Sequence, residues 1–270
     1  MRAFQGADAP LSLCPPEKDA KWRFFWRIGA PPQETAFPQL NAAPVVPAAF
    51  PQWQRVMDSW GSKLLAAAEA VAALAALGFG LPADAFTSRM AGGAHLLAPT
   101  ASDFSRFGAL GTVLAGYHYD LNFISAHGRS RYPGLYVWTR EGRRVGVKIP
   151  PGCLLLQGGA QFQYLTGGHC LAGFHEVVVS EGTVEAIAAA AAAAPPRSQW
   201  RISSTLFAHI NSDVRLEPLA PFDTPAARAA YPPVLTGAQV AAELAAINLG
   251  EGSSGADAAA ADGAAAGGSA

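Results

Sequence analysis

The spacing of hydrophobic positions predicts one long helix in the first third of the chain. Apolar residues recur at helical spacing over about residues 52–77, after Pro51 and before Gly78. We expect the large apolar side chains to form its buried face: Val56, Trp60, Leu64, Val71, Leu74 and Leu77. The helix is therefore interpreted as a scaffold that packs on the outside of the elements that follow.

A different pattern begins at Ala94 and lasts to Leu219. Short runs of β-branched and aromatic residues alternate there with turns rich in Gly and Pro, which is typical of a sandwich, a barrel or a jelly roll. Eight strands are predicted, over residues 112–119, 121–126, 134–139, 144–149, 153–157, 161–165, 174–180 and 200–210. An alanine-rich helix over residues 184–194 interrupts them, and a last amphipathic helix is predicted over residues 236–249.

The pattern divides the chain into five regions. Residues 1–50 are rich in proline and carry aromatic residues between positions 22 and 26, so we expect an arm that packs its rings onto the domain surface. A supporting helix region over residues 51–92, a jelly-roll domain over 93–220 and a C-terminal helix region over 221–249 follow. The last segment, residues 250–270, contains only Glu, Gly, Ser, Ala and Asp, and this composition predicts a disordered tail.

Composition excludes several classes of protein. The 270 residues carry a net charge of −1, which argues against a nucleic-acid partner, because such proteins neutralise phosphates with clustered Lys and Arg. The apolar run over residues 64–80 is too short and too rich in alanine to predict a membrane span. The three cysteines, Cys14, Cys153 and Cys170, fit neither a zinc pattern nor a disulfide framework. We therefore expect a reduced, cytoplasmic setting.

Three short motifs within the strand region could carry chemistry. His118 and Asp120 are two residues apart, so on a strand both would point to the same face and could ligate one metal ion. His175 begins a valine-rich strand and could supply a third ligand from elsewhere in the sheet, although a lone histidine of this kind is more often a core residue. Arg201 and Ser203 offer a guanidinium and a hydroxyl on one face, which suits a carboxylate. Each motif alone is a weak signal.

The order of these motifs, and the segments around them, give a resemblance that is much more specific. The series resembles the iron(II)/2-oxoglutarate-dependent dioxygenases, in particular the isopenicillin N synthase-like branch. Residues 150–168 are similar to the family's PPG segment and the Q…TGG segment that follows it. Residues 134–138 are similar to its GL-x-V strand, and residues 206–219 to the exit from its R-x-S strand. The resemblance extends over roughly residues 50–249.

The resemblance implies a mainly β fold, a double-stranded β-helix or jelly roll with an N-terminal supporting helix and a C-terminal helix. It implies that His118, Asp120 and His175 bind Fe(II), and that Arg201 and Ser203 bind the distal carboxylate of 2-oxoglutarate. Dioxygen and a small organic substrate would complete the reaction, with hydroxylation as the default outcome and succinate as co-product. No nucleic-acid or membrane partner is implied.

The sequence departs from the family pattern in three places. The family's Asn-x-Tyr pair, whose tyrosine helps to bind the co-substrate, has no counterpart in residues 98–104. The stretch from the distal histidine to Arg201 is longer than usual, and the chain before the supporting helix is shorter, so we expect a shortened variant. Two alternatives stay open: an iron and dioxygen oxidase that does not use 2-oxoglutarate, and a non-catalytic jelly-roll module with a vestigial metal site.

Further polar residues are weaker candidates for the site. Four of them are expected to line the pocket or orient a ligand: Asn122, Tyr136, Gln157 and Gln161. The remaining histidines, His95, His127, His169 and His209, are interpreted as structural or exposed. Five arginines surround a predicted hairpin: Arg129, Arg131, Arg140, Arg143 and Arg144. Such a stretch is usually a solvated face, and the alternative is that it attracts an anionic substrate.

Overall fold

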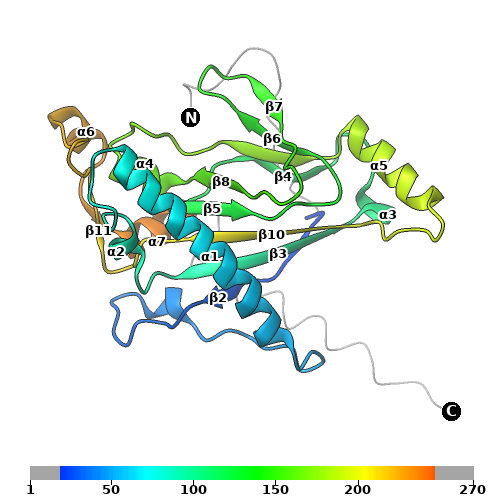
Figure 1. The fold of residues 1–270 in the computed structure, drawn as a ribbon, viewed down its shortest axis with the longest axis horizontal. Coiled ribbons are helices and arrows are strands. Elements are labelled where there is room, and N and C mark those ends of the chain that lie inside the picture. The colour runs from blue at the N-terminus through cyan, green and yellow to red at the C-terminus, as the bar shows by residue number, and fades with distance from the viewer. Residues whose placement is uncertain (1–18, 247–270) are drawn as a thin grey trace.

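Two antiparallel sheets and a long helix dominate the computed structural model, which describes residues 19–246 (Figure 1). The strands of the larger sheet follow the order β1 (Trp22–Arg23), β3 (His95–Asp103), β10 (Trp200–Ala208), β5 (Ile124–His127) and β8 (Leu155–Gly158), and β2 (Trp26–Ile28) also pairs with β3. The smaller sheet follows the order β4 (Val113–His118), β9 (His175–Val178), β6 (Leu135–Trp138) and β7 (Arg144–Gly146). A short ladder joins β11 (Arg215–Leu216) to β12 (Val234–Leu235).

The predicted long helix is confirmed as α1 (Trp53–Gly78), which packs on the larger sheet (Figure 1). The prediction of its buried face was wrong. Its inward face consists mainly of small residues, Met57, Gly61, Leu64, Ala68, Ala72 and Ala76. The predicted face is largely exposed, with only Leu64 buried: Val56, Trp60, Val71, Leu74 and Leu77 lie at the surface. The inward face carries small side chains because they let the helix backbone lie close to the sheet.

The strand predictions are confirmed except in two segments. Residues 161–165, expected as a strand, belong to a helix, α4 (Ala160–Leu165). Gln161 and Leu165 are its buried residues, four positions apart, so this segment follows the period of a helix and not that of a strand. The second difference is β3, a nine-residue strand that the sequence pattern did not predict and that joins β1 and β2 to β10. Pro99 lies within it, and proline ordinarily argues against a central strand.

The remaining helices are short and lie at the ends of the sheets. They are α2 (Thr87–Met90), α3 (Phe104–Phe107), α5 (Glu181–Ala192), α6 (Pro225–Ala230), α7 (Thr236–Ala246) and a 3-10 turn over Pro38–Asn41. The helix α5 corresponds to the predicted alanine-rich helix, and a capping box between Ser180 and Thr183 fixes its first turn. The predicted tail over 250–270 and the last three residues of the predicted C-terminal helix lie outside the described residues.

The N-terminal arm adds strands to the larger sheet. Trp26 on β2 is buried, and its indole donates a hydrogen bond to Asp58 on α1 at 2.7 Å. Trp22 and Phe25 remain about half exposed, so the expected packing of the aromatic cluster holds for only part of it. The arm nevertheless places Arg23 directly opposite Thr100 on β3.

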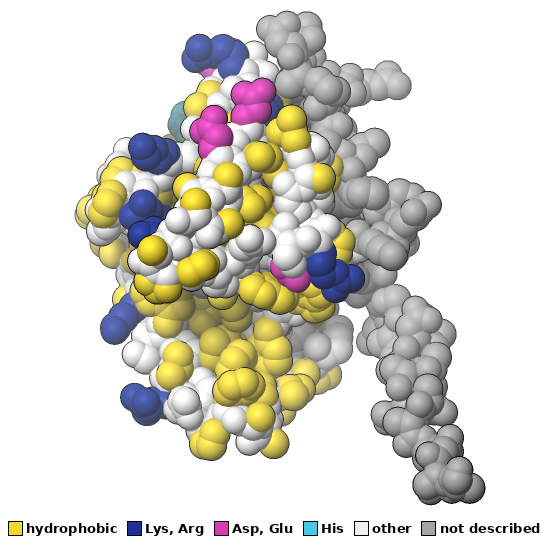
Figure 2. All heavy atoms as spheres, turned by 90° about the vertical axis from the view of Figure 1, so that its right-hand side faces the viewer, with side chains coloured by type: hydrophobic (Ala, Val, Ile, Leu, Met, Phe, Trp, Pro, Cys, Tyr) yellow, Lys and Arg dark blue, Asp and Glu magenta, His cyan; other side chains and the backbone are white. Residues whose placement is uncertain are grey.

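Exposed apolar side chains are a general feature of this surface. Figure 2 shows hydrophobic side chains over much of the end of the molecule at α5 and α3, with Lys and Arg at its margin.

By length and composition α1 could also cross a membrane, but its inward face packs on β2, β3, β5 and β10. Such packing is what the core helix of a folded domain requires.

Close contact between α1 and the sheet leads to a stability prediction. A methyl group at Gly61 would collide with the buried side chain of Ile28. Gly61→Ala is therefore expected to lower the free energy of unfolding by about 1–3 kcal/mol, as overpacking does. Gly78→Ala is the matched control, because a methyl group there meets nothing within 4 Å. It should leave stability unchanged or raise it by up to ~1 kcal/mol. Urea unfolding of both variants tests this, and equal stabilities would contradict it.

Candidate functional site

Pairing between β4 and β9 brings two histidines together. His118 lies directly opposite His175 in this ladder, and their ring centroids are 4.2 Å apart. Asp120 follows two residues after His118, and its Oδ1 lies 3.7 Å from His118 Nε2 and 3.9 Å from His175 Nε2. The three residues offer one ligand atom each, all within 4.8 Å of one another. This spacing suits a single metal ion.

Backbone carbonyls orient both imidazole rings. His118 Nδ1 lies 2.6 Å from the carbonyl oxygen of Gly116, and His175 Nδ1 lies 3.1 Å from that of Gly173. A proton on each Nδ1 can be donated to these carbonyls, which leaves the Nε2 lone pairs directed toward Asp120. The same arrangement fixes the tautomer that a metal ligand requires.

The carboxylate of Asp120 is held by its other oxygen. Oδ2 accepts a hydrogen bond from Ser125 Oγ at 2.6 Å and a second from Gln157 Nε2 at 3.2 Å. Burial alone would raise the pKa of Asp120, but the nearby imidazoles of His175 and His118 and the Ser125 hydrogen bond lower it below its usual value. The carboxylate is thus charged, and its Oδ1 is free to face a cation.

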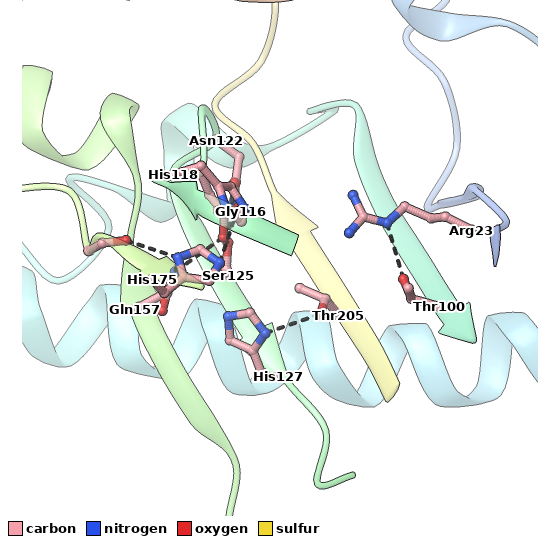
Figure 3. Close-up of polar contacts among 12 residues, drawn as sticks. Arg23, Thr100, Gly116, His118, Asn122, Ser125, His127, Gln157, His175 and Thr205 are labelled. Atoms are coloured by element: carbon pink, nitrogen blue, oxygen red, sulfur yellow. Dashed lines mark hydrogen bonds and ion pairs between the residues drawn. The ribbon is translucent and has the colours of Figure 1, made fainter. Parts of the chain in front are cut away.

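His127 is a residue of this site that sequence reasoning missed. It lines the same cavity, and its ring centroid lies 5.8 Å from that of His175 (Figure 3). Its Nδ1 lies 3.1 Å from Thr205 Oγ1, and its buried Nε2 has no hydrogen-bond partner among the described residues. Burial lowers the pKa of His127 to about 4, so the ring is neutral. The available signal was its position directly after the predicted strand over residues 121–126.

Arg201 and Ser203 lie side by side on β10 in the same cavity. Arg201 is buried, its Nη1 lies 3.3 Å from Ser203 Oγ, and its Nε has no partner within the described part of the chain. Burial lowers the pKa of Arg201 to about 10, which still leaves the guanidinium charged at neutral pH. A buried cation with an unsatisfied donor is a suitable partner for a carboxylate.

The cavity that joins these groups has a volume of about 410 Å³. The triad, His127, Arg201 and Ser203 all line it, together with Thr100, Ser102 and Thr205 from the larger sheet. Its size is that of a pocket for small molecules. One face therefore carries possible metal ligands, and another carries a cation for an acid group.

The other four candidate residues do not line this cavity. Gln157 holds the triad through the hydrogen bond that it donates to Asp120, and its Nε2 lies 3.0 Å from His175 Nδ1. Asn122 accepts from Ser125 and donates to the carbonyl of Ala208, so it supports the group that holds Asp120. Tyr136 and Gln161 lie elsewhere, and the expectation that they line the pocket is not supported by their positions.

Each of these two residues has a local role. The guanidinium of Arg144 lies 3.5 Å from the ring centre of Tyr136. Gln161 is fully buried, accepts a hydrogen bond from the backbone of Ile210 and donates one to Gln239 on α7. They connect elements of the scaffold to one another.

The five arginines between positions 129 and 144 fall into two groups, those that line the cavity and those that do not. Arg129 and Arg131 line the cavity, whereas Arg140 donates to the carbonyl of His169 and Arg144 pairs with the buried Glu176. Among the remaining histidines, His95 and His209 are buried, as expected for structural residues, and the backbone of His209 donates to His95 Nδ1.

Comparison with family models and with curated proteins finds no match. Solved structures do match. A Caulobacter crescentus protein assigned to the 2OG-Fe(II) oxygenase family has a TM-score of 0.72 at 22% identity, over 90% of this chain and 78% of that one. A full-length Neurospora crassa protein in complex with alpha-KG has a TM-score of 0.67 at 18% identity, and the match covers 84% of this chain and 66% of that one. JOX2 in complex with 2OG, Fe and JA has a TM-score of 0.59 at 16% identity, and the match covers 87% of this chain and 61% of that one.

This chain thus spans 66% of the length of the Neurospora crassa protein and 61% of the length of JOX2. At these identities the similarity establishes the fold. The protein has two antiparallel sheets and a long N-terminal helix arranged as in the 2OG-Fe(II) oxygenases, with a His-Asp-His group in its cavity.

Proposed function

We propose that this protein is an iron(II)- and 2-oxoglutarate-dependent oxygenase that oxidises a small organic substrate. One observation carries the proposal: His118 Nε2, His175 Nε2 and Asp120 Oδ1 face one another in a cavity that is also lined by the buried guanidinium of Arg201, on β10 of the larger sheet. A metal ion and a dicarboxylate would occupy these two positions together. The fold shared with the 2OG-Fe(II) oxygenases supports the same assignment.

The donor set fits iron(II). Two neutral imidazoles and one carboxylate on one side of a metal leave the opposite coordination positions open, which is the arrangement of non-haem iron oxygenases. Iron(II) held there supplies the dioxygen chemistry that oxidises a C–H bond. The chain's own contribution is to fix the ligands: Ser125 and Gln157 hold the carboxylate, and two backbone carbonyls hold the imidazoles.

The part of the cavity that β10 lines fits the co-substrate. Arg201 would bind the distal carboxylate of 2-oxoglutarate, and Ser203 would donate to the same group. His127 lines the same cavity, and its Nε2, which has no hydrogen-bond partner among the described residues, could bind a polar group of a bound acid. All three residues are contributed by adjacent strands β10 and β5, so their spacing is set by the sheet.

We further propose that residues 93–220 form a double-stranded β-helix, which residues 51–92 and 221–249 support from outside. The two sheets, with the triad at β4 and β9 and the arginine on β10, are consistent with this domain arrangement. A cytoplasmic location is proposed from the two described cysteines, Cys153 and Cys170, which are both free.

Loss of one ligand tests the metal site. Asp120→Ala is expected to abolish succinate production from 2-oxoglutarate with iron(II), because it removes the only carboxylate of the group. Asp84→Ala is the matched control, since Asp84 is exposed and distant in the sequence. Succinate formed per enzyme is the measurement. Full activity of the Asp120 variant would contradict the assignment, and circular dichroism checks that it is folded.

The residue that holds the carboxylate ligand by a hydrogen bond gives a second prediction. Ser125→Ala removes the 2.6 Å hydrogen bond that holds Asp120 Oδ2 and should weaken Fe(II) binding roughly 10- to 100-fold. Metal affinity measured by titration is the readout, with exposed Ser59→Ala as control. Unchanged affinity would show that Ser125 does not position the carboxylate.

Substitution of Arg201 tests the co-substrate. Arg201→Ala should weaken 2-oxoglutarate binding by about 2–4 kcal/mol, roughly 30- to 1000-fold, while iron affinity stays nearly constant. Arg201→Lys should restore part of the loss, because an ammonium cannot reproduce the two-pronged contact. Ser203→Ala should cost about 1 kcal/mol. Dioxygen consumption with a substrate but without 2-oxoglutarate would contradict the assignment and favour the oxidase alternative.

A further inference from the structure

The wall of the cavity carries far more positive than negative charge. Its charged residues are Asp120 and six cations, Lys21, Arg23, Arg129, Arg131, Lys148 and Arg201. The chain as a whole has a net charge of −1, so this excess is local. A bound metal ion would neutralise Asp120 and so increase the local excess of positive charge. Arg201 can be assigned to the co-substrate, which leaves five cations to be explained.

Most of these cations have no ion-pair partner among residues 19–246. Lys21 pairs with Asp19 at 2.8 Å. No carboxylate within residues 19–246 lies within ion-pair distance of Arg23, Arg129, Arg131 or Lys148. Like charges that gather around a concave site raise the local concentration of anions. The cavity is therefore suited to an anion in addition to 2-oxoglutarate.

Arg23 lines this site from β1. It lies opposite Thr100 on β3, and Thr100 lies opposite Ser203 on β10. Residues directly opposite one another across antiparallel strands share a face of the sheet, so Arg23 lies in one row with the proposed co-substrate site, two strands away. Figure 3 shows its guanidinium directed toward the imidazoles of His118 and His127.

The guanidinium of Arg23 is held in place, and its two terminal nitrogens are available as hydrogen-bond donors. Its Nε donates to Thr100 Oγ1 at 3.1 Å. The rings of Phe25 and Phe207 each lie 5.9 Å from its central carbon, which favours a fixed orientation. No hydrogen bond from its two terminal nitrogens occurs within the described part of the chain. These two parallel donors match the two oxygens of a carboxylate.

Arg23 and Arg201 line the same cavity from different strands of the larger sheet. Arg23 lies on β1 opposite Thr100, Arg201 lies on β10 opposite Ser102, and β3 runs between β1 and β10. Neighbouring strands are about 4.8 Å apart, so the backbones of the two arginines are roughly 10 Å apart. Each arginine can therefore bind an acid group of its own.

We propose that Arg23 binds a carboxylate of the oxidised substrate, and that this substrate is a small organic acid. The inference rests on the proposed function, because it takes Arg201 as the co-substrate site. Arg129, Arg131 and Lys148 then attract the anion to the cavity, and Arg23 anchors it so that the rest of the molecule faces His118 and Asp120. The N-terminal arm thus contributes a specificity-determining residue.

Binding of paired probes tests the proposal. Ni(II)-loaded protein saturated with 2-oxoglutarate would be titrated calorimetrically with acetate, hexanoate, phenylacetate and 2-naphthoate, and with the uncharged amide of each. At least one acid should bind 10-fold or more tightly than its amide. Arg23→Gln should weaken binding of that acid roughly 10- to 100-fold, to the level of the amide. Arg23→Lys should recover part of the loss, and exposed Arg55→Gln should bind like wild type.

Several outcomes would overturn the proposal. They are absence of saturable binding by every acid, equal binding of acid and amide, unchanged binding in Arg23→Gln, and preference for inorganic phosphate over all four acids. A loss of 2-oxoglutarate affinity in Arg23→Gln as large as that in Arg201→Gln would also overturn it, because Arg23 would then serve the co-substrate.

Failure of the proposed function gives a different result. If the wild type does not bind 2-oxoglutarate, the probes are titrated into metal-free protein carrying Arg201→Gln. Binding of an acid that depends on Arg23 in that background still supports the anion site. Its absence there overturns the anion site independently of the iron chemistry. Thermal unfolding checks that each variant is folded.

Discussion

The direct pairing of His118 with His175 across β4 and β9 is the contact on which the rest of the site depends. Two residues directly opposite one another on antiparallel strands point to the same face, and a slip of one residue would turn one imidazole away. The ladder is irregular just before this pair, with register shifts between Val113 and Ala115 and between Ala115 and His118. Such irregularities re-aim side chains, and here they precede the point where both rings face the cavity.

Other contacts hold this pairing in place from the outside. Glu176 follows His175 and is buried on the opposite face of β9, where it pairs with Arg144 on β7 at 2.5 Å. The guanidinium of Arg144 lies over the ring of Tyr136 on the strand between them. Loss of Arg144, which is itself exposed, would leave the buried carboxylate of Glu176 without its cation, so the pair fixes β9 relative to β6 and β7.

The site also joins the two sheets. Asp120 follows β4 of the smaller sheet, whereas its hydrogen-bond donors Ser125 and Gln157 belong to β5 and β8 of the larger one. A buried carboxylate must be paired or hydrogen-bonded, and here the donors come from one sheet and the imidazoles from the other. The arrangement that would hold a metal ion therefore also fixes the distance between the sheets.

The sequence by itself determined the local elements, the helix over Trp53–Gly78 and most strands, because hydrophobic periodicity follows the period of each element. It offered His118, Asp120 and His175 as one group only through the order of motifs that resembles the dioxygenases, and the structure brings the three together. Tertiary structure decided which face of α1 is buried, that residues 160–165 form a helix, and that His127 lines the cavity. It also brought Arg23 opposite Thr100, 77 residues away, through strand pairing. Local periodicity cannot encode such contacts, because they depend on which strand edge the arm joins.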